Sequence, residues 1–273
     1  MSGRVLPGPD AAWTGGRVRD FAQCVLAPNP SPWTLEGTNT WIIGAADACV
    51  IIDPGPDDDS HQDAVLATCE ERAQIPRLIL LTHGHADHSE GARTLASRAG
   101  VEVRAWDSRW SFDPVHRGNP DVLSDGEIVD IDGRPLSIVA TPGHSSDSVC
   151  MVVDDCVLTG DTVLGRGTTV VAYPDGDLGE YLESLEALRA FCADHGVVSL
   201  LPGHGPVLDD PVGTLTAYQE HRAMRLDQVR TVWESGGDIE AIVDEVYADV
   251  PAAVRVAALQ TVRAQVAYLE GAR

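Results

Sequence analysis

Short runs of apolar and β-branched residues recur along the first 208 positions and predict a series of strands. Two long segments between these runs, 60–73 and 178–194, place apolar residues at helical spacing. A third helical segment begins after His88 and ends at Arg98. The expected strands are residues 21–26, 40–43, 49–52, 78–81, 101–106, 127–131, 136–140, 148–153, 156–159 and 197–201. A strand-rich run followed by helix, occurring twice, predicts a layered domain of mixed α/β composition.

Two short motifs indicate where helices begin and end. Ser60 and Asp63 have the spacing of a capping box at the start of the first helix. His195-Gly196 has the form of a helix C-terminal cap, because glycine adopts the left-handed conformation easily.

Beyond Leu208 the strand pattern stops, and apolar residues recur at spacings of three and four. Gly236-Gly237 interrupts this pattern, Asp238 is placed to cap a second helix, and Pro251 opens a third. We therefore predict two domains, 1–208 and a helical 209–273.

The charge is strongly acidic. Forty-two Asp and Glu residues face 19 basic ones, giving −23, and all the basic residues are Arg. A chain without Lys cannot have a Walker or Schiff-base lysine, and its acidic balance opposes nucleic-acid binding, which depends on neutralising phosphates. No apolar run approaches the roughly 20 residues of a membrane span, and residues 1–10 lack the pattern of a signal peptide. These features predict a cytoplasmic protein with no membrane partner.

The six cysteines form no C-x-x-C pair and are expected to be reduced and buried, with a Cys150–Cys156 bridge as the lesser alternative.

Histidine and aspartate residues gather directly after the predicted strands. Residues two apart in an extended loop point the same way, so His83 and His85 can bind one ion together. The chain then turns into a helix, which directs Asp87 and His88 toward a second ion. Imidazole and carboxylate groups suit zinc, iron or manganese. Three further candidates follow later strands, in the runs Pro-Gly-His144, Thr-Gly-Asp161 and Pro-Gly-His204.

The run His83-Gly84-His85-Ala86-Asp87-His88 resembles the H-x-H-x-D-H motif of the metallo-β-lactamase superfamily. The resemblance extends from Asp53 through His204 and implies an α+β fold, a four-layer αββα sandwich. It implies that two Zn²⁺ ions are bound per chain, with iron or manganese as alternatives. By this resemblance, Asp53 supports the ligands from behind. The implied ligands are His83, His85 and His144 for the first metal, Asp87, His88 and His204 for the second, and Asp161 as a bridge between them.

The resemblance also implies chemistry, namely hydrolysis by a hydroxide that bridges the metals, with Asp87 orienting this nucleophile. True metallo-β-lactamases carry Cys where this chain has Asp161, and they are exported, so antibiotic hydrolysis is not expected as the main role. Glyoxalase II shares the ligand set but uses basic residues, including Lys, to hold glutathione.

Residues 35–41, 160–169 and 218–222 resemble the β-lactamase-like protein 2 family, which implies a winged-helix-like tail and a single-stranded RNA substrate. The chain ends with almost no residues for a wing, and its last helix offers only Arg255 and Arg263 for phosphate contact. Three functions therefore stay open: an RNA endonuclease, a glyoxalase-II-like hydrolase of a small ester, thioester or lactone, and a nucleic-acid-binding regulatory protein without catalysis. Candidate substrate contacts are Asn39, Arg166, Thr168 and Thr169, whereas His61, His116, His195 and His221 are interpreted as structural.

Overall fold

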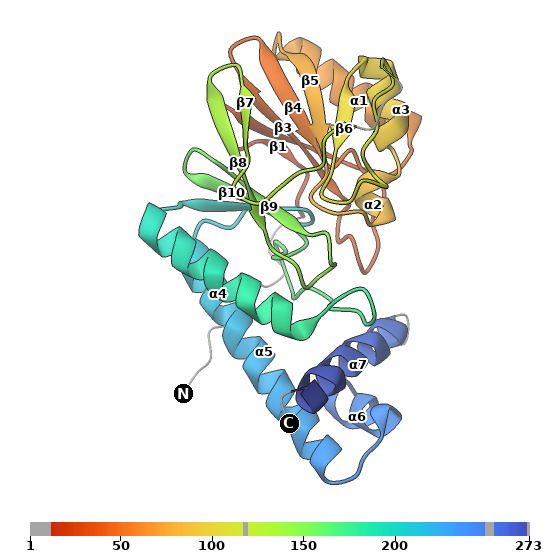
Figure 1. The fold of residues 1–273 in the computed structure, drawn as a ribbon. Helices are drawn as coiled ribbons and strands as arrows, with labels where there is room; N and C mark the ends of the chain where they lie inside the picture. The colour runs from red at the N-terminus through yellow and green to blue at the C-terminus, as the bar shows by residue number, and fades with distance from the viewer. Residues whose placement is uncertain (1–11, 117–119, 249–253, 272–273) are drawn as a thin grey trace.

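Two β-sheets lie face to face in the computed structural model, which describes residues 12–116, 120–248 and 254–271 (Figure 1). The first sheet has its strands in chain order: β1 (Gly16–Arg17), β2 (Ala22–Leu26), β3 (Asn39–Ala45), β4 (Ala48–Ile52), β5 (Ile75–Leu80) and β6 (Glu102–Arg104). The second has the order β11-β10-β9-β8-β7: β7 (Ile128–Ile131), β8 (Arg134–Ala140), β9 (Val149–Val153), β10 (Cys156–Gly160) and β11 (Ser199–Pro202). In both sheets antiparallel hairpins are followed by parallel pairs, β4·β5·β6 and β10·β11.

Helices cover the outer faces of both sheets. On the first sheet these are α1 (Asp59–Glu71) and α3 (Ala92–Ala99), with the short α2 (Ala86–Ser89) at its lower end, and on the second it is α4 (Leu178–His195). Alternate residues of β4 enter different layers: Val50 and Ile52 pack between the sheets, whereas Cys49 and Ile51 pack against the helices. This double burial explains the continuous apolar run in the sequence. The predicted αββα sandwich of the α+β class is confirmed.

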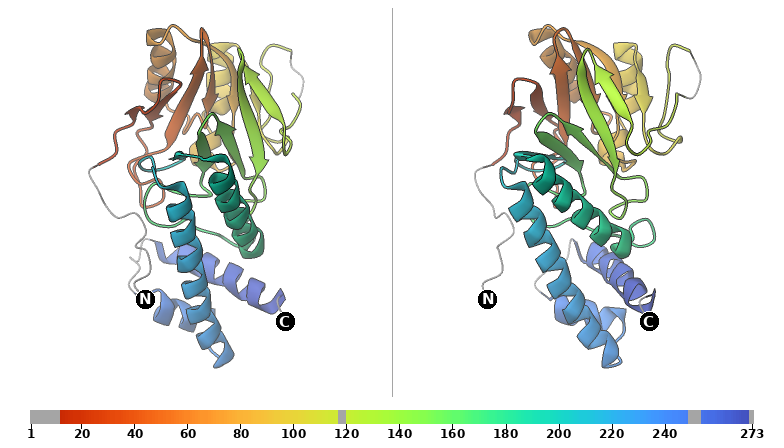
Figure 2. Two further views of the ribbon diagram at one scale, coloured as in Figure 1. Left: turned by 90° about the vertical axis from the view of Figure 1, so that its left-hand side faces the viewer. Right: turned by 60° about the vertical axis from the view of Figure 1, so that its left-hand side comes forward.

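The chain after residue 208 folds as helices in its described parts, 209–248 and 254–271, which contain no strand and so no wing. These helices are α5 (Pro211–Glu234), α6 (Ile239–Val246) and α7 (Arg255–Gly271), and Asp238 caps α6 by accepting a hydrogen bond from Ala241 N, as expected. Helix α5 runs alongside α4, and one apolar cluster continues from the second sheet into α6 and α7 (Figure 2). The division at residue 208 stays a prediction, and Pro251, expected to open the last helix, lies outside the described residues.

Two local expectations are wrong, and a third, that the cysteines are reduced and buried, is confirmed. Helix α1 is capped by Asp58, whose carboxylate accepts from His61 N at 2.8 Å, so the Ser60 capping box does not form. The helix expected to run from His88 to Arg98 is divided at Gly91, whose N–H bonds to Gly55 O instead of continuing the helix. All six cysteines are free and buried, which excludes the Cys150–Cys156 bridge. Among the described residues no helix is long and apolar enough to cross a bilayer.

Candidate metal centre

The expected metal ligands meet at one edge of the sandwich, because each follows the carboxyl end of a strand. The run His83–His88 comes after β5, His144 after β8, Asp161 after β10 and His204 after β11. Within each sheet these strands point the same way, so the loops after them gather at one edge.

His83, His85 and His144 form the first group of potential ligands. His83 Nε2 lies 3.1 Å from His85 Nδ1, and His144 Nε2 lies 3.0 Å from the same Nδ1 atom. Zinc bonds to imidazole nitrogen at about 2.0–2.1 Å, so two nitrogens of a tetrahedral site stand roughly 3.3 Å apart. The group therefore has nearly the spacing that a tetrahedral ion requires.

Asp87, His88 and His204 form the second group. His88 Nε2 and His204 Nε2 are 3.2 Å apart, and Asp87 Oδ2 lies 3.2 Å from His204 Nε2 and 3.7 Å from His88 Nε2. Two imidazoles and one carboxylate leave one corner of a tetrahedron free, as in zinc sites that do chemistry.

Asp161 lies between the two groups. Its Oδ1 is 3.4 Å from His88 Nε2 and 3.5 Å from His204 Nε2, and its Oδ2 is 3.7 Å from His144 Nε2. The Oδ1 atom is buried and makes no hydrogen bond among the described residues. A buried oxygen without a partner is costly, and a metal ion would satisfy it. The donor set thus fits two ions that share one carboxylate.

Each histidine is held by its other ring nitrogen. His83 contacts Thr82 Oγ1 at 3.0 Å, His85 contacts Asp175 Oδ2 at 3.1 Å, and His88 contacts Asp53 Oδ2 at 2.9 Å. His144 Nδ1 contacts the carbonyl oxygen of Val170 at 2.8 Å, and His204 Nδ1 contacts that of Gly37 at 3.2 Å. Such bonds fix the ring orientation and the tautomer of a metal-binding histidine.

Asp53 stands behind the site, where the sequence places it. Its carboxylate accepts from Thr82 N and Thr82 Oγ1 at 2.8 and 2.7 Å and also contacts His88. Its backbone has a φ of 53°, in the left-handed region that non-glycine residues seldom adopt. Thr40 Oγ1 donates to the Asp53 carbonyl at 2.7 Å and contacts His61 Nε2 at 2.8 Å. These contacts hold the strained residue and give His61 the structural role expected of it.

The two groups differ in how strongly they hold protons before an ion binds. Burial lowers the pKa of His83 and of His144. Burial also acts to lower the pKa of His88, but the Asp161 and Asp53 carboxylates outweigh it and raise that pKa well above its ordinary value. The pKa of His204 rises to about 9, because Asp161 and Asp87 outweigh the effect of burial. At neutral pH His83 and His144 are thus neutral, whereas His88 and His204 each hold an additional proton.

We expect a proton to be released when the second group takes up its ion at pH 7. Ligand imidazoles must be neutral, so an ion displaces protons from His88 and His204. Because the pKa of His204 is about 9, protons compete fully with the metal ion for this imidazole at pH 7. The proton competition weakens as the pH rises through 9, so the affinity of the second group for its ion should increase over that interval. Calorimetric zinc titrations in buffers of different ionisation enthalpy measure the released protons. Uptake of two ions without proton release would contradict this assignment.

Two of the expected substrate contacts lie behind the site and do not face it. Asn39 is fully buried, and its side-chain nitrogen donates to Pro202 O and Gly205 O at 2.9 and 2.8 Å. It accepts from Trp13 Nε1 at 2.8 Å. Thr169 is buried as well and donates to Asp161 O at 2.8 Å. Both side chains position the loops that carry ligands.

The other two expected contacts, Arg166 and Thr168, line a cavity of about 460 Å³ beside the metal groups. Arg166 forms an ion pair with Glu36 across this cavity wall. The remaining wall is mainly apolar: Pro32, Trp33, Leu35, Leu164, Val170, Ala172, Val256 and Ala257. Helix α7 supplies the last two of these, so the tail closes one side of the cavity.

Sequence reasoning missed several residues that shape the site. Thr82 and Asp175 orient ligands, and Glu36 pairs with Arg166. Only Thr82 had a local signal, since it directly precedes His83 after a buried strand. Trp33, Val256 and Ala257 reach the cavity from distant segments, which no spacing in the chain could indicate.

Comparison with known proteins agrees with this geometry. Residues 33–204 match the family model of the metallo-beta-lactamase superfamily. The chain is 30% identical over 261 residues to a "Beta-lactamase-like protein 2 homolog" of Caenorhabditis elegans, covering 90% of this chain and 83% of that one. It is also 30% identical over 268 residues to an "Atrochrysone carboxyl ACP thioesterase" of Aspergillus chevalieri, covering 94% and 82%.

Solved structures share the fold. A metallo-beta-lactamase family protein of Thermus thermophilus superposes with a TM-score of 0.75 at 19% identity, covering 92% of this chain and 93% of that one. A beta-lactamase domain protein of Burkholderia ambifaria gives a TM-score of 0.78 at 19% identity, covering 94% and 88%. Both likenesses span nearly the whole chain, including its helical tail.

Proposed function

The chain belongs to the metallo-β-lactamase superfamily of hydrolases, and from this premise we propose that it is a dinuclear zinc enzyme that hydrolyses small thioesters or esters with an apolar acyl group. The observation that carries the proposal is the cavity beside the metal groups. Its volume of about 460 Å³ suits a small molecule. Its wall is mainly apolar, and the one arginine among its described lining residues is already paired with Glu36.

Zinc ions held by the two groups would supply a nucleophile at neutral pH and polarise the oxygen of the scissile bond. His83, His85 and His144 would hold one ion, and Asp87, His88 and His204 the other, with Asp161 shared. The nitrogen–nitrogen spacings of 3.0 to 3.2 Å support zinc, because they are close to those of its tetrahedral geometry.

Asp87 has a second part in the proposal, which is to orient the attacking water. Burial raises its pKa, but the hydrogen bond from His204 and the charge of His88 outweigh burial and lower the pKa to about 2. Before an ion binds, Asp87 is therefore a carboxylate at neutral pH, and a bound cation would favour the same charged form, so Asp87 can accept a hydrogen bond from water and holds no proton to donate. This supports the orienting role over delivery of a proton to the leaving group.

Thioester hydrolysis is favoured over RNA cleavage by the charge of the surroundings. An RNA site must hold several phosphates. Each phosphate contact with a single strand contributes about −0.7 to the slope of the logarithm of the binding constant against the logarithm of the salt concentration. The chain carries −23, and the described part of the cavity wall offers a single arginine, Arg166, which Glu36 neutralises. The likeness to β-lactamase-like protein 2 homologues keeps RNA as the second candidate.

A side-by-side assay decides between the two. We expect measurable hydrolysis of short acyl thioesters and esters by the zinc-loaded protein, with any RNA cleavage slow and only mildly salt-dependent. His83→Ala should abolish thioester turnover, whereas His116→Ala, at an exposed histidine outside the metal groups, should not change it. Rapid, steeply salt-dependent RNA cleavage without thioester turnover would overturn the proposal and establish a nuclease.

A further inference from the structure

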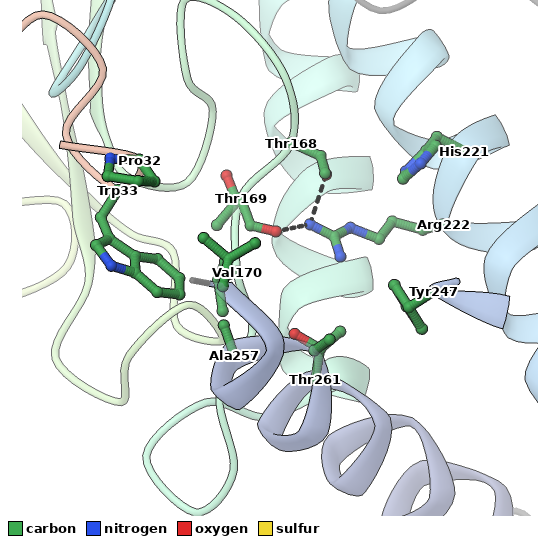
Figure 3. Close-up of a pocket in the computed structure, with 12 residues that line it drawn as sticks. Pro32, Trp33, Thr168, Thr169, Val170, His221, Arg222, Tyr247, Ala257 and Thr261 are labelled. Atoms are coloured by element: carbon green, nitrogen blue, oxygen red, sulfur yellow. Dashed lines mark hydrogen bonds between the residues drawn. The ribbon is translucent and has the colours of Figure 1, made fainter. Parts of the chain in front are cut away.

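A second cavity, of about 200 Å³, lies beside the first and is enclosed by the helical tail (Figure 3). Residues 32–33 and 168–170 form one side of it, and α5, Tyr247 and α7 form the other. The two cavities share the wall residues Pro32, Trp33, Thr168, Val170 and Ala257. The two cavities are therefore neighbours, with these residues between them.

Arg222 brings an unpaired charge into this apolar space. Its side chain extends from α5 and is only 5% exposed, yet no described Asp or Glu pairs with it. One terminal nitrogen, Nη2, donates to Thr168 Oγ1 at 2.8 Å and to Thr169 O. The guanidinium also lies over the Tyr181 ring, 5.0 Å from its centre.

The other two guanidinium nitrogens make no hydrogen bond to any described residue. Nε is buried and lacks a partner, and Figure 3 shows Nη1 on the side of the cavity where Thr261 lies. A buried cation is costly unless an anion or several acceptors compensate it. Arg222 thus keeps one uncommitted terminal nitrogen, Nη1, at the cavity wall, while its enclosed Nε lacks a partner among the described residues.

His221 lines the cavity next to Arg222 and is also unsatisfied. Neither ring nitrogen makes a hydrogen bond to the described residues, and Nδ1 is fully enclosed. Burial, together with the charges of Arg222 and Arg225, lowers the pKa of His221 to about 4. The imidazole is therefore neutral at pH 7 and keeps one donor and one acceptor. This corner is locally positive in a chain whose net charge is −23.

We propose that the second cavity binds a carboxylate at the far end of an apolar acyl group, with Arg222 and His221 as its hydrogen-bond donors. The substrates would then be thioesters or esters whose acyl group carries a distal carboxylate, a class that rests on the proposed hydrolase function. Arginine suits this task, because its permanent charge lets the uncommitted Nη1 donate a charge-assisted hydrogen bond to a carboxylate. The shared wall places the carboxylate cavity next to the site of hydrolysis.

Binding can be measured without turnover. The probes are 3-phenylpropanoate and its neutral isostere 3-phenylpropanamide, titrated calorimetrically into chelator-treated protein so that the acid cannot coordinate a metal ion. We expect the acid to bind about 10-fold more tightly than the amide, in keeping with one charge-assisted pair. Arg222→Gln should abolish this preference, and His221→Phe should reduce it several-fold. Arg230→Gln, a matched control on the exposed face of α5, should keep it.

Equal affinity for acid and amide in the wild-type protein would overturn the proposal. A folded Arg222→Gln protein that keeps the preference would do the same, because Arg222 would then only tie α5 to Thr168 and Thr169. Should Arg222→Gln fail to fold, His221→Phe decides: a reduced preference supports the carboxylate site, and an unchanged one contradicts it.

Turnover gives the second readout. The heptanedioic monothioester of N-acetylcysteamine should have a higher kcat/KM than the heptanoic thioester, mainly through a lower KM, and Arg222→Gln should remove the difference. Hydrolysis of both at equal kcat/KM would refute the substrate class and leave the proposed hydrolase standing. Hydrolysis of neither would refute the hydrolase, while the binding result would still report on the cavity.

Discussion

Asp161→Ala should remove both metal ions and nearly all hydrolytic activity. Its two carboxylate oxygens lie 3.4 to 3.7 Å from His88, His204 and His144, so the substitution takes a donor from each group. Loss of a residue that only hydrogen-bonds to a metal ligand lowers metal affinity or activity about 10–100-fold. Loss of a ligand shared by both ions should have a larger effect, a decrease of roughly 10³-fold in kcat/KM. Elemental analysis should find about two zinc ions per wild-type chain and fewer than one in the variant.

Asp175→Ala is the graded control. Within the described parts of the chain, the Asp175 side chain hydrogen-bonds only to the outer nitrogen of His85, at 3.1 Å, and it is half exposed. Its loss should therefore weaken the first ion alone, by about 10–100-fold. His204→Ala should weaken mainly the second ion. An Asp161→Ala protein that retains two ions, or variants that all lose both ions equally, would be incompatible with the division of ligands.

Gly143→Ala should destabilise the fold by about 3 kcal/mol or more. The backbone at Gly143 has a φ of 127°, which side chains rarely tolerate, and an added Cβ would stand 2.3 Å from both the N and the Cα atom of Tyr181. Backbone strain and overpacking against helix α4 each contribute about 1–3 kcal/mol. At roughly 2–4 °C per kcal/mol, the melting temperature should fall by about 6–12 °C. Because His144 is the next residue, zinc affinity of the first group should fall too.

Gly133→Ala separates the two contributions. Gly133 also has a positive φ, of 88°, but no atom of the described residues lies within 4 Å of a Cβ there. The Gly133→Ala protein should be destabilised only by backbone strain, by about 1–2 kcal/mol, and should keep its zinc affinity. Equal melting temperatures for the two variants would show that helix α4 yields to the added methyl group.

The metal centre could be predicted from the sequence because its chemistry is concentrated in short motifs. His83, His85, Asp87 and His88 lie within six consecutive positions, and the remaining candidate ligands each follow a strand whose apolar run is easily identified. The sandwich could be predicted for the same reason, since strands buried on both faces, such as β4, leave a continuous apolar signal.

The rest depends on contacts between distant segments. Asn39 was expected at the substrate, but an amide at the start of a strand has the same local pattern whether it faces a ligand or, as here, the carbonyls of Pro202 and Gly205. His221 was interpreted as structural because its position on a helix does not reveal that α7 and residues 168–170 enclose it. The cap of α1 was misplaced by two residues, since Asp58 and Ser60 are both good capping residues.

The tie between Asn39 and the His204 loop has a consequence for biosynthesis. Asn39 and Gly205 are 166 positions apart, and Asn39 N also bonds to Gly203 O. At about 5–20 residues per second, a ribosome needs roughly 10–30 s to make the chain between them. From the synthesis of His88 until that of His204, the nascent protein displays His83–His88 without His204 or the loop that holds it. A second ion could be bound in its finished site only after most of the polypeptide has emerged, so metal insertion at this group would be a late step in maturation that follows closure of this loop of 166 positions.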